Sequence, residues 1–231
     1  MHPEVLYHPP DPALPSFRTS HRRPHIYPGG GTLAVTMRLA GSVTRPTIRR
    51  VQAAQLRHGN RIPPDVYWGA TAEERRAFRL YASGQTTRRD LNGPFHFDHR
   101  PEIRDFVMEA LLEEERRGGW EILAASLMPN HAHLLLRHTH LKRHMGTVLR
   151  LWKSYTARRC NQLLGASGSP FWEHENYDSY VDSPTALLRH LEYTLHNPVA
   201  GALCNSWMEW PGNYCAPRLR RAVNSRPRLA G

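Results

Sequence analysis

The feature that most constrains the fold is a pair of β-prone segments joined by a turn. The chain reads WEILAASLM at residues 120–128, then Pro129-Asn130, then HAHLLLR at residues 131–137. Both segments are rich in aliphatic residues, and a Pro-Asn pair favours a turn. Strands joined so closely pair antiparallel. We therefore predict a hairpin, and a sheet that is at least partly antiparallel.

Further segments carry strand or helix signals. Residues 32–41 alternate and are β-prone, which predicts a strand. Capping residues, apolar spacing and terminal glycine or Asn-Pro signals predict helices. The predicted helices span residues 71–82, 101–117, 142–164 and 183–197. Asn197-Pro198 is expected to end the last helix, because a residue before proline avoids the helical region. The order strand, helices, hairpin, helices predicts an α+β domain.

The composition divides the chain into three parts. Residues 1–31 are rich in Pro, His and Arg and end in three glycines, so we expect a disordered segment there. Residues 32–216 would form the domain, with an insertion at about 59–100 that is punctuated by Pro and Gly. Residues 217–231 would form a basic tail.

The charge indicates the class of partner. The 231 residues carry a formal net charge of +11, which favours a polyanion such as nucleic acid. The three cysteines are odd in number and show no C-x-x-C motif, which indicates reduced thiols. No apolar run is long enough to span a membrane, and we expect a cytoplasmic protein.

The histidines of the hairpin are candidates for metal ligands. In a strand, residues two apart project to the same face, so His131 and His133 would be neighbours. Ala132, Leu134 and Leu136 would then enter the core on the opposite face. Two imidazoles at this spacing can bind one divalent ion, although two histidines on the polar face of an amphipathic strand would have the same spacing.

The helix at residues 183–197 offers a candidate nucleophile. Leu187, Leu188, Leu191 and Leu195 form one apolar arc, and Tyr193 lies nearly opposite it. His190 and Asn197 fall on the same side as Tyr193. An exposed tyrosine and a helix-ending asparagine would give the same pattern.

Four stretches together resemble one family. They are MPNHAHLLL, then FWEHENYDSYV with LLRHLEYTLHNPVAGAL, then WMEWPGNYCA. The chain is similar over residues 33–216 to the REP-associated tyrosine transposases, which belong to the HUH single-strand transposases. The resemblance implies a ferredoxin-like antiparallel sheet packed with helices. It departs from the family pattern at Ala132, which is smaller than the usual branched residue, and in the absence of a basic residue after Val199.

The resemblance also implies an activity. His131, His133 and Asn197 would bind Mg²⁺ or Mn²⁺, and Tyr193 would attack a phosphate of single-stranded or hairpin DNA. A 5′-phosphotyrosine would form and a 3′-hydroxyl would leave, after which the reverse step would rejoin DNA. Glu173, His174, Glu175 and His190 are further possible ligands. The protein would act as a monomer or a homodimer.

Basic residues of the helix at 142–164 are candidates for DNA contacts. They are Arg143, Arg150, Lys153, Arg158 and Arg159. Trp172 and Tyr177 would either stack on bases or pack within the protein. Two other functions stay open: a catalytically inactive nucleic-acid-binding protein of the same fold, and a metal-dependent nuclease in which water attacks.

Overall fold

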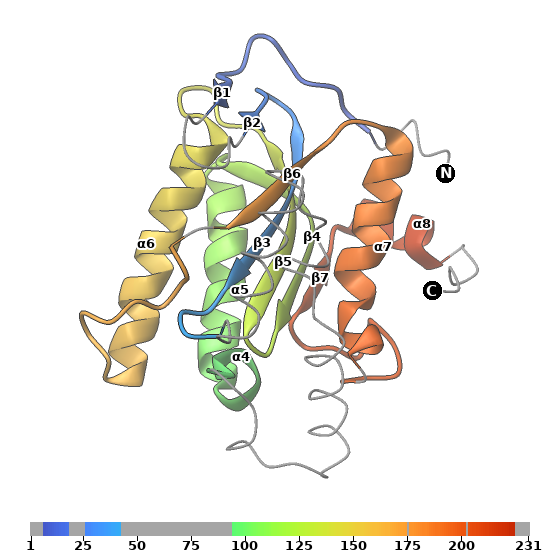
Figure 1. The fold of residues 1–231 in the computed structure, drawn as a ribbon. Coiled ribbons are helices and arrows are strands. Elements are labelled where there is room, and N and C mark those ends of the chain that lie inside the picture. Colours follow the sequence, from blue (N-terminus) through green and yellow to red (C-terminus); the bar gives the residue numbers. More distant parts are fainter. Residues whose placement is uncertain (1–6, 19–25, 43–93, 175, 202, 225–231) are drawn as a thin grey trace, which may run out of the picture.

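A five-stranded antiparallel sheet forms the centre of the protein (Figure 1). The computed structural model describes residues 7–18, 26–42, 94–174, 176–201 and 203–224. The strand order is β6-β3-β5-β4-β7, and each neighbouring pair runs antiparallel. The strands are β3 (Thr32–Arg38), β4 (Trp120–Met128), β5 (His131–His138), β6 (Tyr177–Val181) and β7 (Asn213–Cys215). The predicted hairpin is β4 and β5, and the predicted α+β fold with an antiparallel sheet is confirmed.

Helices cover both faces of the sheet (Figure 1). One face packs against α5 (Pro101–Arg116) and α6 (Met145–Leu164), with the short α4 (His96–His99) beside them. The other face packs against α7 (Pro184–Ala200) and α8 (Arg220–Asn224). Among the helices of the described residues, none is long and apolar enough to cross a membrane.

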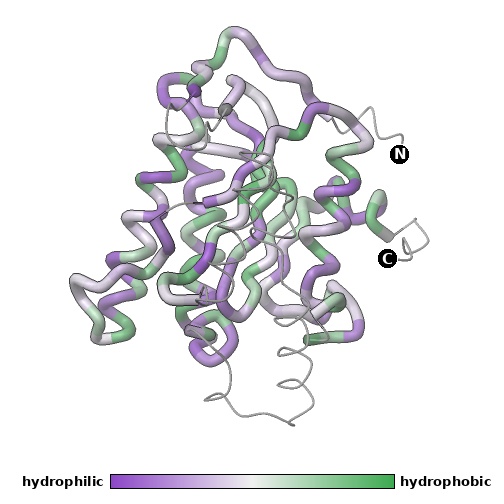
Figure 2. The backbone as a smooth tube through the Cα atoms, in the orientation of Figure 1, coloured by the Kyte–Doolittle hydropathy of each residue, from purple (hydrophilic) through white to green (hydrophobic). Residues whose placement is uncertain are grey.

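Each face of the sheet has its own apolar core. The cluster under α5 and α6 takes Ala132, Leu134 and Leu136 from β5, as their alternation predicts. The cluster under α7 takes Leu135 from β5 and the four leucines of the predicted arc. Figure 2 shows hydrophobic residues gathered in the middle of the sheet, where β4 and β5 lie. β5 is buried along its length except at Arg137, so His131, His133 and His138 are enclosed by protein.

The helix boundaries follow the capping signals with one exception. Gly165 ends α6 at a φ of 64°, and Ser183 caps α7 by accepting a hydrogen bond from the Ala186 N–H. The prediction that Asn197-Pro198 ends α7 is wrong, because the helix continues to Ala200 with Pro198 inside it. A proline this close to the end removes only one helical hydrogen bond, and Pro198 is buried against the core.

Both terminal segments contain more structure than their composition predicts. In the described part of residues 1–31, β1 (Phe17–Arg18) pairs with β2 (Ile26–Tyr27), and Tyr27 is buried in the core. The expected basic tail folds at η3 (Pro217–Leu219) and α8, where Leu219 and Val223 are buried. In both segments, buried aliphatic and aromatic side chains stabilise structure that the composition does not predict. The expected helix at 71–82 and most of the expected insertion at 59–100 lie outside the described residues.

Candidate metal and tyrosine site

The two candidate ligands lie on the α7 side of β5. His131, His133 and Leu135 share this face, since Leu135 belongs to the core under α7. His131 is 1% exposed and His133 is 4% exposed. The alternation of the strand therefore places two polar rings beneath a helix, at the point where the apolar row under α7 ends.

The imidazoles face each other through their Nε2 atoms, which are 3.1 Å apart. The Nδ1 atom of His131 lies 2.7 Å from Asn130 Oδ1, and the Nδ1 atom of His133 lies 2.9 Å from Thr36 Oγ1. When both Nδ1 atoms donate to these oxygens, both Nε2 atoms keep a lone pair, and the two nitrogens are close enough to bind one ion. In metal-binding histidines, the ring nitrogen that does not bind the metal commonly donates a hydrogen bond to an oxygen, which fixes the orientation of the ring.

The surroundings keep both rings neutral. Burial lowers the pKa of His131 well below its ordinary value, with further contributions from His133 and Arg38. Burial, and then Arg38, lower the pKa of His133 to about 3. Neutral imidazole is the form that binds a metal ion.

The separation of the two nitrogens fits one shared ion. Two nitrogens at about 2.1 Å from an ion lie about 3.0 Å apart at a right angle and about 3.4 Å apart at a tetrahedral angle. The observed 3.1 Å lies within this range. His131 and His133 therefore fit as two adjacent ligands of a divalent ion.

A row of polar residues crosses the sheet at His133. The strand register aligns Thr36 on β3, His133 on β5, Ser126 on β4 and Asn213 on β7. All four belong to the face under α7, because residues aligned across an antiparallel sheet project to the same side. The neighbouring row aligns Arg38 with His131, and Arg38 is buried.

Helix α7 places Tyr193 beside the histidines. The rings of Tyr193 and His133 are 5.3 Å apart between centroids and nearly perpendicular, at 80°. Tyr193 is 48% exposed, whereas Leu191 and Leu195 on the inner side of the helix are buried. One side of the phenol ring therefore contacts the candidate metal site, and the residue also reaches the surface.

Asn197 lies one turn after Tyr193 on the same helix. Its Nδ2 atom donates to the backbone oxygen of Tyr193 at 2.8 Å. The amide oxygen takes no part in that bond. Asn197 is thus tied to the backbone of the candidate nucleophile, and a role as third ligand stays a prediction.

The other candidate ligands are placed differently. The Glu173 carboxylate accepts a hydrogen bond from Gly41 N–H, and the backbone oxygens of Glu173 and His174 accept from Lys153 Nζ. Glu175 lies outside the described residues. Within the described ranges, no group of three or more His, Cys, Asp or Glu side chains could hold an ion.

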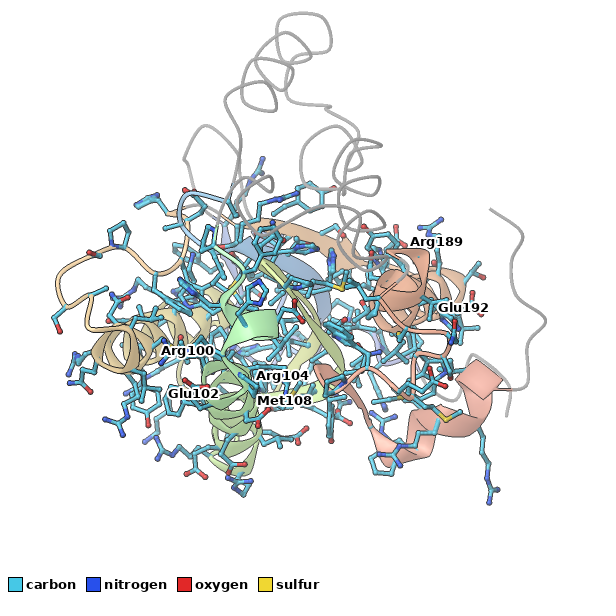
Figure 3. The ribbon with its side chains drawn as sticks, turned by 90° about the horizontal axis from the view of Figure 1, so that it is seen from below. Arg100, Glu102, Arg104, Met108, Arg189 and Glu192 are labelled. Atoms are coloured by element: carbon cyan, nitrogen blue, oxygen red, sulfur yellow. The ribbon has the colours of Figure 1, made fainter. Side chains whose placement is uncertain are left out.

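The predicted DNA-binding residues lie across the sheet from the histidines. Arg143, Arg150, Arg158 and Arg159 are exposed on or beside α6, which packs on the face opposite α7. Lys153 differs from them, because its ammonium is bound to two backbone oxygens and burial lowers its pKa to about 8. Figure 3 shows the separation of the helices on the two faces of the sheet. Arg189 and Glu192 on α7 lie well apart from the labelled residues on α5 or just before it, which are Arg100, Glu102, Arg104 and Met108.

The two aromatic candidates have different surroundings. Trp172 is buried in the core under α5 and α6, where its Nε1 atom donates to Thr156 Oγ1 at 2.9 Å. It therefore packs within the protein and is not placed to stack on a base. Tyr177 on β6 is half-buried and aligns with Thr36 at the edge of the polar row.

Several polar residues around the histidines were not predicted as part of the site. Thr36 and Arg38 alternate with Val35 and Met37, so the period-two pattern of residues 32–38 could have identified a polar face. Asn130 could have been identified as the direct neighbour of His131. Ser126 gave no comparable signal, because it sits alone in an apolar strand.

Comparison with known proteins supports the fold. No protein-family model matches the sequence, and no curated protein matches it. The structure is similar to a solved structure of a REP-associated tyrosine transposase bound to a REP hairpin, with a TM-score of 0.50 and 17% sequence identity. The match covers 92% of this chain and 92% of that chain. At this identity the similarity shows the fold alone.

Proposed function

We propose that this protein is a transposase-like HUH endonuclease that cleaves and rejoins single-stranded DNA. One observation carries the proposal: the Nε2 atoms of His131 and His133 face each other, and the ring of His133 contacts the ring of Tyr193. A pair of metal-binding histidines next to a partly exposed phenol provides the groups needed for nucleophilic attack on a phosphodiester. The similar solved transposase bound to a hairpin supports DNA as the substrate.

The reaction is a transesterification in two steps. The Tyr193 hydroxyl oxygen attacks phosphorus, a new P–O bond forms, and the bond to the 3′-oxygen breaks. The phenol loses its proton, and the leaving 3′-oxygen gains one. The 5′-phosphotyrosine is then attacked by a 3′-hydroxyl, which restores the phosphodiester and the phenol. One ester bond replaces another in each step, so no nucleotide cofactor is consumed.

His131, His133 and Asn197 would hold Mg²⁺ or Mn²⁺. A divalent ion offsets the negative charge that develops on the phosphate oxygens. The protein contributes the positions: Asn130 and Thr36 hold the imidazoles, and the leucines of α7 fix Tyr193 above them. The neutral imidazoles add no negative charge beside the phosphate.

DNA binding would extend over the far side of the molecule. The exposed arginines of α6 would contact phosphates, with Tyr155 between them as an exposed aromatic. Because α6 and α7 lie on opposite faces of the sheet, bound DNA would pass around an edge of the sheet to reach Tyr193. Contacts on α6 would therefore affect affinity more than the chemical step.

A second function is a binding protein of the same fold that does not cleave. Its support is the burial of both imidazoles, since an ion and a phosphate reach them only after the surrounding chain moves. Incubation with hairpin-flanked single-stranded DNA and Mn²⁺, followed by denaturing electrophoresis, separates the two functions. A covalent adduct that is lost in Tyr193→Phe supports cleavage. DNA binding without an adduct supports the second function, and an adduct mapped to Tyr155, Tyr177 or Tyr180 contradicts the assignment of Tyr193.

A further inference from the structure

Ser126 is the buried residue of the polar row that the proposed chemistry does not use. Its side chain is 0% exposed, and its Oγ atom has no hydrogen-bond partner among the described residues. The register aligns it with His133 on one side and with Asn213 on the other. Buried hydroxyls are nearly always hydrogen-bonded, so an unpaired one beside a metal-binding histidine indicates a ligand.

Asn213 has a fixed orientation next to Ser126. Its Nδ2 atom donates to Leu195 O at 2.9 Å and to Trp207 O at 2.8 Å. Two carbonyl partners identify the nitrogen end of the amide, because a carbonyl oxygen can only accept. The Oδ1 atom is buried and has no partner in the described part of the chain. Asn213 therefore offers an acceptor on the side of the sheet where Ser126 needs one.

The two residues together can present an oxygen to an ion. Cross-strand side chains have Cβ atoms roughly 5 Å apart, so one water can bridge the Ser126 hydroxyl to Asn213 Oδ1. The oxygen lone pairs then point away from β7, toward His133. In this arrangement Ser126 can accept a hydrogen bond from an ion-bound water.

We propose that Ser126, oriented by Asn213, adds an oxygen to the ion site besides that of Asn197 and makes the site select a six-coordinate ion such as Mg²⁺ or Mn²⁺ over Zn²⁺. This inference rests on the proposed function, which places the ion at His131 and His133. Two imidazoles by themselves favour Zn²⁺, whereas Mg²⁺ and Mn²⁺ prefer oxygen ligands and retain water.

The test is ion selectivity in Ser126→Ala, measured on the full chain without DNA. Mn²⁺ affinity is followed by paramagnetic resonance, and Zn²⁺ affinity by competition calorimetry. We expect Mn²⁺ to bind about 10- to 100-fold more weakly, the usual effect of losing a group behind a metal ligand, with little change for Zn²⁺. Co²⁺ should change from the weak visible absorption of six-coordinate ions to the strong absorption of tetrahedral ones. Ser126→Cys, which adds a soft ligand, should raise Zn²⁺ affinity.

Ser42→Ala is the matched control. Ser42 is also buried with an unpaired Oγ in the described structure, but it lies in the turn after β3 and outside the polar row. It should leave Mn²⁺ and Zn²⁺ affinities unchanged. Thermal unfolding without metal checks that Ser126→Ala folds, and removal of an unpaired buried hydroxyl should not lower its midpoint.

The outcomes separate the two proposals. If wild type binds Mn²⁺ and Ser126→Ala binds both ions as wild type does, the role of Ser126 is refuted and the proposed function stands. If Ser126→Ala loses Mn²⁺ and Zn²⁺ affinity equally, Ser126 supports the site without selecting the ion, and the inference is overturned. If wild type binds no Mn²⁺, or if His131→Ala binds it as well as wild type, the ion site of the proposed function fails and this inference fails with it.

Discussion

Replacement of Thr36 by valine should weaken ion binding at a site that the side chain does not itself ligate. Thr36 Oγ1 lies 2.9 Å from His133 Nδ1, and both residues are buried. Valine has nearly the same shape but offers no hydroxyl. A buried ring nitrogen left without its partner costs about 1–3 kcal/mol. His133 would also lose the bond that fixes its orientation, which typically weakens metal affinity by about 10- to 100-fold.

Calorimetric titration with Mn²⁺ measures the affinity, and denaturant unfolding without metal measures the stability. Thr32→Val is the control, because Thr32 is a buried threonine on the same strand and the same face, aligned with Arg137 rather than His133. The control should retain wild-type Mn²⁺ affinity. Wild-type affinity in Thr36→Val would show that Thr36 does not hold His133, and an equal loss in Thr32→Val would attribute the effect to β3 in general.

Further predictions concern the ion, the helix and the ammonium of α6. His131→Ala should abolish Mn²⁺ binding and cleavage while single-stranded DNA binding persists, which calorimetry and gel shifts would check. Asn197→Ala should weaken Mn²⁺ binding, and Asn197→Asp should retain it, since a carboxylate is a charged oxygen donor. If Asn197→Ala cleaves at the wild-type rate under limiting Mn²⁺, the role of Asn197 is purely structural. Leu191→Ala should cost about 2–5 kcal/mol of unfolding free energy, because the side chain is fully buried. The pKa of Lys153 falls from an ordinary 10.5 to about 8 on folding. The unfolded chain therefore binds more protons between these values, and stability should rise with pH across this window in wild type but not in Lys153→Met.

The local sequence determined the parts of the site that lie within one element. Alternation along residues 131–137 placed His131 and His133 on one face, because a strand has a period of two whatever surrounds it. The leucine arc of residues 183–197 likewise predicted that Tyr193 lies on the side of the helix opposite the leucines. The Pro-Asn turn fixed the antiparallel pairing of β4 and β5. Each of these follows from backbone geometry over a few residues.

Only the tertiary structure decided which elements meet. Strand β7 is three residues long and has no measurable periodicity, so its pairing with β4, and with it the alignment of Ser126 and Asn213, could not be predicted. The amphipathic pattern of α6 identified its buried stripe but not the face of the sheet it covers, and its arginines lie opposite the histidines. Pro198 stayed within α7 because burial outweighed a local signal. The strand register and the face of the sheet that a helix covers are set by burial of apolar surface between segments far apart in the chain. A local sequence pattern does not identify the distant segment against which its element packs.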